Sequence, residues 1–271
     1  MDNGSTDSTK EVICSFQSRL PLTYIFEATR LKSAALNTGL LDISGDLVVM
    51  TDDDVLPTSD WLSQLRIAAD AQPNFSIFGG TIVPHWELPP ENWFLKWQWG
   101  ILSITDPSRE EGPIAATRIY GPNMAVRSDL IKAGYRFDTS LGPAGSRYQM
   151  GEDTDFLQRL EKAGHKAWHC KQAVVGHMIR KDQVKKEWVL RRALPFGRAE
   201  YRRELRDEPN PPASLLGIPR YAIREILTQA VRFVSATLTQ DAAAAFSERW
   251  QLHYLVGRAI EGRALHGRGR K

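Results

Sequence analysis

Gly45-Asp46-Leu47-Val48-Val49-Met50-Thr51-Asp52-Asp53-Asp54-Val55-Leu56-Pro57 is the stretch that decides the fold. Its short apolar run after a glycine is typical of a strand that is covered on both faces. Pro57 ends the pattern. The stretch predicts a buried strand at residues 46–51, with three carboxylates directly after its end.

Strand and helix patterns alternate on both sides of this stretch. Apolar residues predict strands at residues 20–26 and 76–83, and helices at residues 33–42 and 58–70. Strands that alternate with helices favour an α/β fold with a mostly parallel central sheet flanked by helices. Loop signals dominate residues 84–118, where four tryptophans could stack on sugars or pack in a core: Trp86, Trp93, Trp97 and Trp99.

Composition and charge restrict the class of protein. The chain has 271 residues, of which 42% are hydrophobic and 25% charged, which suits either one large domain or one domain with an extension. Its two cysteines, Cys14 and Cys170, suggest no disulfide framework and no cysteine metal site, so a reducing compartment is expected. No apolar run approaches the roughly 18 residues of a membrane span.

The net charge of +3 hides an asymmetry between the two ends of the chain. Residues 1–179 hold 16 Lys and Arg against 22 Asp and Glu, whereas residues 180–271 hold 19 against 10. An acidic body with a basic tail suggests metal and substrate chemistry in the first and contact with an anionic partner in the second. Because the excess of basic residues lies in the tail and is not interleaved with exposed aromatic residues on one surface, nucleic acid is not an expected partner.

The three aspartates after the strand, Asp52, Asp53 and Asp54, crowd one rim of the predicted sheet. Such crowding is unfavourable unless a cation neutralises it. Carboxylates at this spacing suit Mg²⁺ or Mn²⁺, which would bridge a diphosphate. A solvated acidic turn before the helix at Thr58 explains the same residues, and both interpretations stay open.

A turn and helix cap is also the simplest interpretation of residues 2–7, Asp-Asn-Gly-Ser-Thr-Asp. The functional alternative places Asp2 at the carboxyl end of a strand, where α/β sheets bind ligands. There its carboxylate could accept hydrogen bonds from a base N–H or a ribose hydroxyl.

Carboxylates open a predicted helix at residues 151–160, and a histidine follows a short apolar strand at residue 177. Glu152 and Asp153 either cap that helix, where its dipole stabilises them, or supply a general base for an acceptor hydroxyl. His177 is either structural or an additional ligand beside a cation held by aspartate.

Taken together, these motifs resemble those of the family 2 glycosyltransferases, which have the GT-A fold, over residues 2 to about 198. They occur in the family's order: residues 2–7, Ala35–Gly39, Gly45–Pro57, Trp61-Leu62, Gly79-Gly80, Gly121–Arg127, Gly134–Asp138, residues 151–155 and His177. The resemblance implies a GT-A domain at residues 1–198 and a basic helical extension at residues 199–271. It also implies an inverting transfer of a sugar from a metal-bound nucleotide-diphosphate sugar to an acceptor hydroxyl, with Mg²⁺ or Mn²⁺ as cofactor.

The resemblance assigns roles to particular residues. Asp2 would contact the nucleoside, and Asn37, Asp52 and Asp53 would help bind the nucleotide sugar. The metal would be held by Asp54, Asp52 and His177. Asp153 is the first choice for the base, with Glu152 as the second. The expected acceptor is a saccharide or a lipid-linked sugar, in polysaccharide or glycolipid synthesis on the cytoplasmic side.

The chain departs from the family pattern in two places. A strand and helix that precede the Asp-Asn-Gly-Ser segment in the family are absent, so the chain as written is expected to be unstable or inactive. Leu36 stands where many relatives carry an arginine that faces the diphosphate, and Arg30 or Lys32 could compensate. Two other functions stay open: a non-catalytic sugar- or polymer-binding protein of this fold, and a nucleotidyltransferase, although no Gly-rich phosphate loop is visible.

In the tail, apolar residues recur at helical spacing between Tyr221 and Leu238, with Arg220, Arg224 and Arg232 among them. This pattern fits a helix docked on the catalytic body, a dimer contact, or an interfacial helix on anionic lipid. The last of these would make the protein peripheral at the inner face of the cell membrane.

Overall fold

The computed structural model describes residues 1–96, 98–144, 147–148, 150–207, 213–215 and 218–268. The chain folds into two compact units. The first comprises residues 1–83, 105–148 and 152–177, and the second comprises residues 84–104, 149–151 and 178–271. The predicted division at residue 198 stays a prediction, although helix α7 (Lys186–Asp207) runs through that position without a break.

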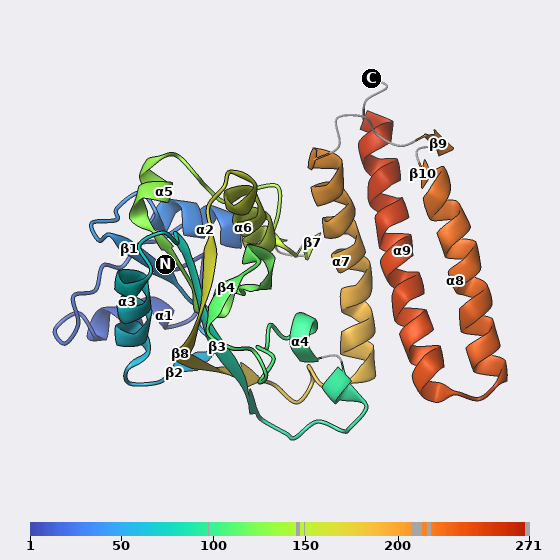
Figure 1. The fold of residues 1–271 in the computed structure, drawn as a ribbon, viewed down its shortest axis with the longest axis horizontal. Helices are drawn as coiled ribbons and strands as arrows, with labels where there is room; N and C mark the ends of the chain where they lie inside the picture. The colour runs from blue at the N-terminus through green and yellow to red at the C-terminus, as the bar shows by residue number, and fades with distance from the viewer. Residues whose placement is uncertain (97, 145–146, 149, 208–212, 216–217, 269–271) are drawn as a thin grey trace. The chain divides into compact units, whose positions relative to one another are not determined.

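Within the described residues, the first unit is built on a six-stranded sheet (Figure 1). The strand order is β1 (Leu47–Met50), β5 (Met124–Arg127), β3 (Ile77–Trp86), β8 (Ala167–Ile179) and β2 (Val55–Pro57), and β4 (Gly112–Ile114) also pairs with β8. A small hairpin of β6 (Pro143–Ala144) and β7 (Arg147–Tyr148) stands apart from this sheet. The last residues of β3 and β8 continue into the second unit.

The sheet is mixed, whereas the sequence predicted a mostly parallel one. Strand β5 lies between β1 and β3 and is antiparallel to both, so β1 and β3 run in the same direction without being neighbours. Strands β3 and β8 are parallel, because hydrogen bonds join Ile77 N–H to Lys166 O at 3.2 Å and Thr81 Oγ1 to Lys171 O at 2.8 Å. The alternation of strands and helices gave the direction of β1 and β3, but it did not reveal the strand inserted between them.

The helices of the first unit are α1 (Thr9–Ser15), α2 (Lys32–Gly39), α3 (Trp61–Ala71), α5 (Ser128–Lys132) and α6 (Glu152–Lys162). Single 3-10 turns at Ala116–Arg118 and Gly121–Asn123 precede β5. The core joins α6 to the sheet: Phe156 stacks on Phe137 at 4.3 Å, and Leu157 and Leu160 are fully buried. Each such side chain stabilises the fold by about 1.5–3 kcal/mol, which holds the first turn of α6 in place.

Four of the five elements predicted between residues 20 and 83 are present. The structure places α2, β1, α3 and β3 at the predicted positions, to within a few residues at each end. The strand predicted at residues 20–26 is wrong. Among the described residues, an isolated parallel bridge joins Asp2 to Phe26. Leu20 and Phe26 are both 54% exposed, so the apolar side chains at the two ends of this segment do not pack in the core.

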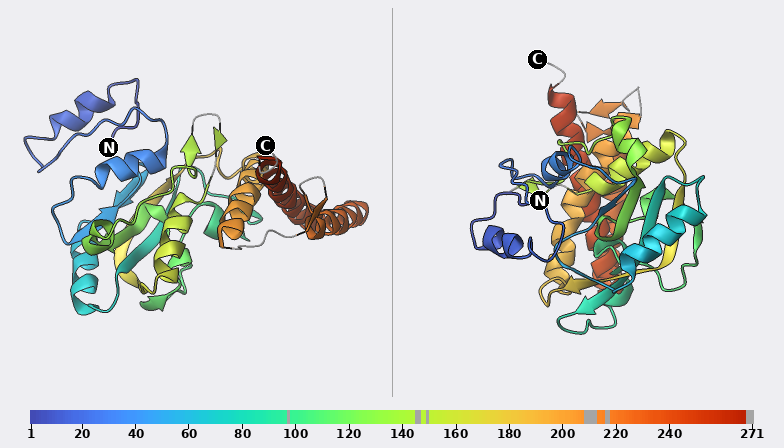
Figure 2. Two further views of the ribbon diagram at one scale, coloured as in Figure 1. Left: turned by 90° about the horizontal axis from the view of Figure 1, so that it is seen from above. Right: turned by 90° about the vertical axis from the view of Figure 1, so that its left-hand side faces the viewer.

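The second unit is mainly helical, which confirms the predicted C-terminal helices. It contains a 3-10 turn (Phe94–Lys96), α4 (Gln98–Ile101), α7, a short ladder of β9 (Ser214–Leu215) and β10 (Ile218–Pro219), α8 (Arg220–Leu238) and α9 (Ala242–Arg268). Helix α9 lies between α7 and α8 (Figures 1 and 2).

Two glycines let α7 and α9 pack closely. A Cβ at Gly197 would lie 1.9 Å from Tyr254 O, and one at Gly257 would lie 2.2 Å from Leu194 O. Larger residues at either position would therefore separate the helices. No helix in the described part of the chain has the length and apolar character needed to cross a bilayer.

Two of the four clustered tryptophans pack against phenylalanines of the second unit. Trp93 meets Phe94 at 5.5 Å and Phe246 at 5.2 Å between ring centroids, and Trp86 meets Phe94 at 6.1 Å. These edge contacts give Trp86 and Trp93 a structural role. Trp97 lies outside the described residues.

Candidate active site

Helix α2 brings Lys32 to the site, and its position is fixed from both sides. Ser33 Oγ donates to Leu141 O at 2.5 Å. Asn37 uses both ends of its amide on one residue, donating to Phe137 O at 2.9 Å and accepting from Phe137 N–H at 2.8 Å. Asn37 thus fixes the backbone of Phe137 against α2. Its predicted contact with the nucleotide sugar stays a prediction.

Four charged side chains of the first unit meet at the start of α6 and form what we name the Lys32 cluster: Lys32, Asp52, Glu152 and Asp153. The Lys32 ammonium lies 2.8 Å from Asp52 Oδ1, 3.7 Å from Glu152 Oε1 and 3.7 Å from Asp153 Oδ2. Three of these residues were predicted from sequence to be functional. The structure brings them together around a lysine that the sequence suggested only as a substitute for a missing arginine.

Burial dominates the electrostatics of the Lys32 cluster. The side chain of Glu152 is 8% exposed, and burial together with the neighbouring Asp153 raises the pKa of its carboxyl to about 7. Burial also raises the pKa of Asp153, although Lys32 opposes the shift. The three carboxylates outweigh the effect of burial on Lys32 and raise the pKa of its ammonium. Lys32 therefore stays charged, while the two carboxyls of α6 titrate above their usual range.

Asp153 lies between the first turn of α6 and the turn at Gly121–Asn123. Acidic residues fill the first turn of α6 and Arg159 and Lys162 fill the last, so the charges complement the helix dipole. A Cβ at Gly121 would lie 2.0 Å from Asp153 Oδ2, so only glycine leaves room for that carboxylate. Within the described residues, Asp153 Oδ1 is buried with no hydrogen-bond partner. A buried oxygen without a donor is what a proton-accepting group would present.

A second pair of predicted residues meets at the neighbouring strand end. His177 Nε2 lies 3.5 Å from Asp54 Oδ2, because β2 and β8 pair with Val55 opposite His177. His177 is buried, and the Asp54 side chain is 37% exposed. Asp53, between Asp52 and Asp54, is exposed.

The donor atoms of Asp54 and His177 fit a partly built divalent-metal site. The described residues hold no cluster of three His, Cys, Asp or Glu side chains that could enclose an ion. A carboxylate and an imidazole nevertheless suit Mn²⁺, and ions of this type commonly take one or two carboxylates and complete their shell with substrate phosphates and water.

Asp2 is held by Tyr24, which the sequence did not indicate. Tyr24 Oη donates to Asp2 Oδ2 at 2.6 Å, and Ser5 N–H donates to Asp2 Oδ1 at 2.8 Å. These bonds lower the pKa of the Asp2 carboxyl, and the first of them raises the pKa of Tyr24 to about 12. Asp2 is therefore an anion with a fixed orientation. The sequence did not reveal this role of Tyr24, because the pattern of residues 20–26 predicted only a strand.

Asn123 of the predicted Gly-Pro-Asn motif is structural. Its Nδ2 donates to Thr81 O and Ala173 O at 3.0 and 2.8 Å, and its Oδ1 accepts from Trp61 Nε1 at 2.8 Å. Asn123 thereby ties β3, β8 and α3 together beneath the Gly121 turn.

Comparison with known proteins relates the chain to a protein family. The model of glycosyl transferase family 2 matches residues 1–133, which include the Asp2 turn, Lys32, the three aspartates and Gly121. The matched part of the chain belongs to glycosyl transferase family 2. The assignment agrees with the resemblance inferred from the motifs.

Two curated relatives resemble this family 2 chain. It is 26% identical over 187 residues to glucosyl-dolichyl phosphate glucuronosyltransferase of Haloferax volcanii, which covers 69% of this chain and 57% of the relative. It is also 26% identical over 204 residues to the succinoglycan biosynthesis protein ExoM of Rhizobium meliloti, covering 74% of this chain and 62% of the relative. The chain thus spans about three fifths of the length of these relatives.

A solved structure confirms the fold of the family 2 chain. The mannosyltransferase PcManGT from Pyrobaculum calidifontis, in complex with GDP-Man and Mn²⁺, superposes with a TM-score of 0.59 at 21% identity. The match covers 96% of this chain and 76% of that one. The predicted α/β fold of GT-A type with a C-terminal helical region is confirmed.

Proposed function

We propose that the protein is a glycosyltransferase that moves a sugar from a nucleotide-diphosphate sugar to an acceptor hydroxyl, with inversion and with the help of a divalent metal. The observation that carries the proposal is the pair of carboxyls on the first turn of α6, Glu152 and Asp153, which have raised pKa values and lie beside the Lys32 ammonium. A general base works best when its pKa lies near the operating pH. Family membership supports the reaction class.

The reaction is a single displacement. The acceptor oxygen forms a bond to the anomeric carbon while the bond from that carbon to the diphosphate oxygen breaks. Asp153 takes the acceptor proton, with Glu152 as the second choice, and the electron pair leaves with the diphosphate. Because the acceptor attacks from the face opposite the leaving group, the configuration at the anomeric carbon inverts.

Lys32 has two tasks in this proposal. Its charge stabilises the ionised carboxylates of Glu152 and Asp153 against burial, and it orients Asp52. It also supplies the positive charge that the family commonly takes from an arginine at the position of Leu36.

The donor is held at the other end of the site. Asp54 and His177, with Asp52, would hold Mg²⁺ or Mn²⁺, and a bound metal would neutralise charge that develops on the leaving diphosphate. Asp2 would accept hydrogen bonds from the nucleoside, and Asp53 and Asn37 would contact the donor. The Mn²⁺ and GDP-Man bound to PcManGT support these roles by analogy of fold.

The acceptor class follows from the relatives' names. One relative is named for a dolichyl phosphate substrate and the other for succinoglycan biosynthesis. These names support a saccharide or lipid-linked acceptor in polysaccharide or glycolipid assembly, which we propose to take place on the cytoplasmic side.

Release of nucleoside diphosphate from a panel of nucleotide sugars, with Mn²⁺ and mixed saccharide and glycolipid acceptors, tests the proposal. The proposal requires turnover with one donor class, its loss on chelation of the metal, and its loss in Asp54→Asn and Asp153→Asn. Such turnover would also contradict the expectation from sequence that the chain as written is inactive. Asp129→Asn, an exposed change on α5, is the matched control. A chain that binds nucleotide sugars without turnover would instead be a binding protein, and release of inorganic diphosphate from a nucleoside triphosphate would indicate a nucleotidyltransferase.

A further inference from the structure

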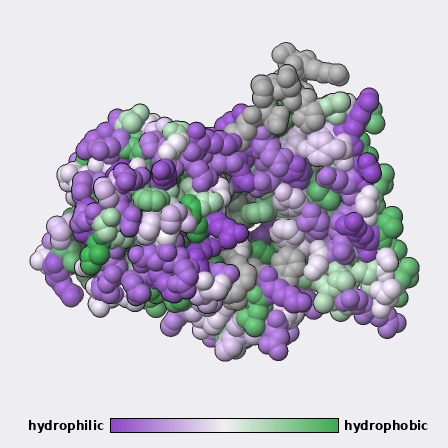
Figure 3. All heavy atoms as spheres, in the orientation of Figure 1, coloured by the Kyte–Doolittle hydropathy of each residue, from purple (hydrophilic) through white to green (hydrophobic). Residues whose placement is uncertain are grey.

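Helix α8 carries an apolar stripe that nothing in its own unit covers. Leu227, Val231, Val234 and Leu238 are 64, 69, 54 and 78% exposed, and their spacing of four, three and four residues places them along one line of the helix. In the view of Figure 3, hydrophobic side chains gather at the right-hand edge, over α8. A continuous exposed apolar stripe marks an interaction surface.

The stripe faces away from α9. Ala222 and Gln229 are the buried residues of α8, and Gln229 Nε2 donates to Glu248 O of α9 at 3.1 Å. Leu227 lies two residues before Gln229, or about 200° round the helix at 3.6 residues per turn. Helix α8 therefore docks on α9 with one face and presents the opposite face to a partner outside the unit.

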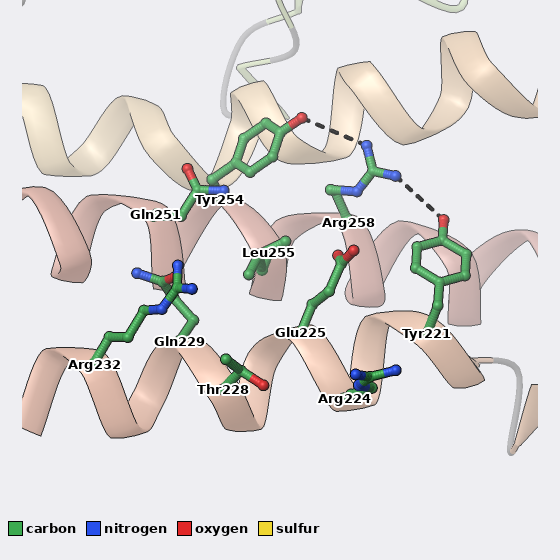
Figure 4. A pocket seen from close by; sticks show the side chains of 10 residues that line it. All are labelled: Tyr221, Arg224, Glu225, Thr228, Gln229, Arg232, Gln251, Tyr254, Leu255 and Arg258. Atoms are coloured by element: carbon green, nitrogen blue, oxygen red, sulfur yellow. Dashed lines mark hydrogen bonds between the residues drawn. The ribbon is translucent and has the colours of Figure 1, made fainter.

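Charge distinguishes the possible partners. Continuing the same four-and-three spacing toward the N-terminus gives Arg224 and Arg220, both exposed, so the line of the stripe ends in two arginines. Glu225 is the only acidic residue of α8, and it lines a cavity of about 590 Å³ between α8 and α9 (Figure 4). Arg224 also lines that cavity.

A second copy of the chain is a poor match for this surface. In a parallel pair of α8 helices, Arg220 and Arg224 would meet the same arginines. In an antiparallel pair, they would meet Leu238 and Val234. Neither arrangement supplies a carboxylate for the guanidinium groups, so both leave charge without compensation at an apolar seam.

We propose that α8 docks the protein on an anionic lipid surface, lying in the plane of the interface. Leu227, Val231, Val234 and Leu238 enter the boundary between headgroups and acyl chains, while Arg220 and Arg224 meet lipid phosphates. The inference does not rest on the proposed transfer activity.

Sedimentation of the full chain with vesicles tests this inference. We expect binding to phosphatidylcholine vesicles that contain phosphatidylglycerol, weaker binding to phosphatidylcholine alone, and loss of the difference at high salt, which screens the arginines. No donor sugar is present, so Asp153→Asn should bind as the unmodified chain does, and a failure of the proposed catalysis leaves this result unchanged.

Matched variants separate the two parts of the surface. Leu227→Ser/Val231→Ser/Leu238→Ser should weaken vesicle binding at least about tenfold, because apolar area no longer leaves water. Leu62→Ser/Ile67→Ser, at positions 57 and 59% exposed on α3, should leave binding unchanged. Arg220→Gln/Arg224→Gln should weaken binding to anionic vesicles about thirtyfold. Arg232→Gln, on the same helix but away from the stripe, should cost clearly less than the roughly fivefold per arginine expected at positions 220 and 224.

Three results would overturn the inference. The unmodified chain could fail to sediment with anionic vesicles. It could bind neutral and anionic vesicles equally, with no effect of the arginine variants. It could also form a dimer in solution that the serine variant dissociates, which would assign the stripe to a second copy. Because all the altered side chains are exposed, circular dichroism should show each variant folded, and the salt dependence of the unmodified chain tests the inference without any variant.

Discussion

Two buried glutamates, one in each compact unit, have pKa values that are shifted in opposite directions. Burial and the neighbouring Asp153 raise the pKa of Glu152 to about 7 in the first unit. At Glu261 on α9, hydrogen bonds from Arg202 and Arg198 of α7 outweigh burial and lower the pKa. Arg198 Nε lies 2.8 Å from Glu261 Oε2, and Arg202 Nε lies 3.0 Å from Oε1.

The number of cations beside each carboxylate explains why the two pKa values shift in opposite directions. Glu261 has two guanidinium partners, so its ionised form is satisfied and joins α7 to α9. In the Lys32 cluster, three carboxylates share one ammonium, and the site carries excess negative charge unless a proton or another cation is present. The first arrangement stabilises a helix packing, whereas the second has the perturbed, incompletely paired charges of functional sites.

The largest expected effect lies at Asp153. Asp153→Asn keeps the shape of the side chain but removes the proton acceptor, so kcat should fall about 10²- to 10⁴-fold. Steady-state kinetics with the preferred donor would measure it, beside Asp129→Asn as the exposed control. An asparagine variant with undiminished kcat would show that Asp153 is not the base and would transfer the role to Glu152.

Glu261→Gln should be the most destabilising of the conservative changes. Removing the carboxylate charge weakens the hydrogen bonds that Arg198 and Arg202 donate to residue 261, and urea denaturation should show a loss of roughly 2–3 kcal/mol. The matched control is Glu200→Gln on α7, which removes a glutamate that pairs with Arg203 and is 22% exposed, against 1% for Glu261, and it should cost under about 1 kcal/mol. If the two variants lost the same free energy of unfolding, Glu261 would contribute no more to stability than Glu200 does.

Glu152→Gln, in contrast, should make the protein more stable than the unmodified chain as the pH rises toward 8. Because the pKa of Glu152 is higher in the folded state than in the unfolded one, its stabilising contribution is complete below about pH 4.5 and is lost as the pH rises through about 7. The unmodified chain should therefore lose roughly 2–3 kcal/mol across this window relative to Glu152→Gln. Melting temperatures measured from pH 4.5 to 8 would check this, and parallel curves for the two proteins would contradict it.

Lys32→Met should have the smallest of these effects on activity. Without the ammonium, the pKa values of Glu152 and Asp153 should rise further, so the rising limb of the pH–rate profile should move to higher pH. At pH 7 we expect kcat to fall about tenfold, with Lys132→Met as the exposed control. An unshifted pH profile would show that Lys32 does not act through these carboxyls.

The sequence located most of the candidate residues, but it did not reveal how they are grouped. Asp52, Glu152 and Asp153 were predicted from turn and helix-start chemistry, because local patterns report where carboxylates follow a strand or open a helix. Lys32 joins them through the packing of α2 on the Phe137 backbone, which depends on residues one hundred positions apart. No local pattern contains that contact.

The same reasoning applies to the fold and to Asp2. The apolar stretches gave β1, α3 and β3, whereas the insertion of β5 between β1 and β3 is a long-range pairing. Tyr24 reaches Asp2 across 22 residues, from a segment whose apolar pattern indicated only a strand. Leu36, which stands where many relatives carry an arginine, was the one local signal that pointed to Lys32.

The most direct test is a carboxyl NMR titration that follows Glu152 and Glu261 in one sample, with each signal assigned through its glutamine variant. The account predicts that Glu152 titrates near pH 7 and Glu261 below the ordinary range of glutamate. If both glutamates titrated together in the ordinary range of an exposed carboxyl, Glu152 would not be perturbed by its surroundings, and the carboxyl pair on α6 would lose its claim to be the active site.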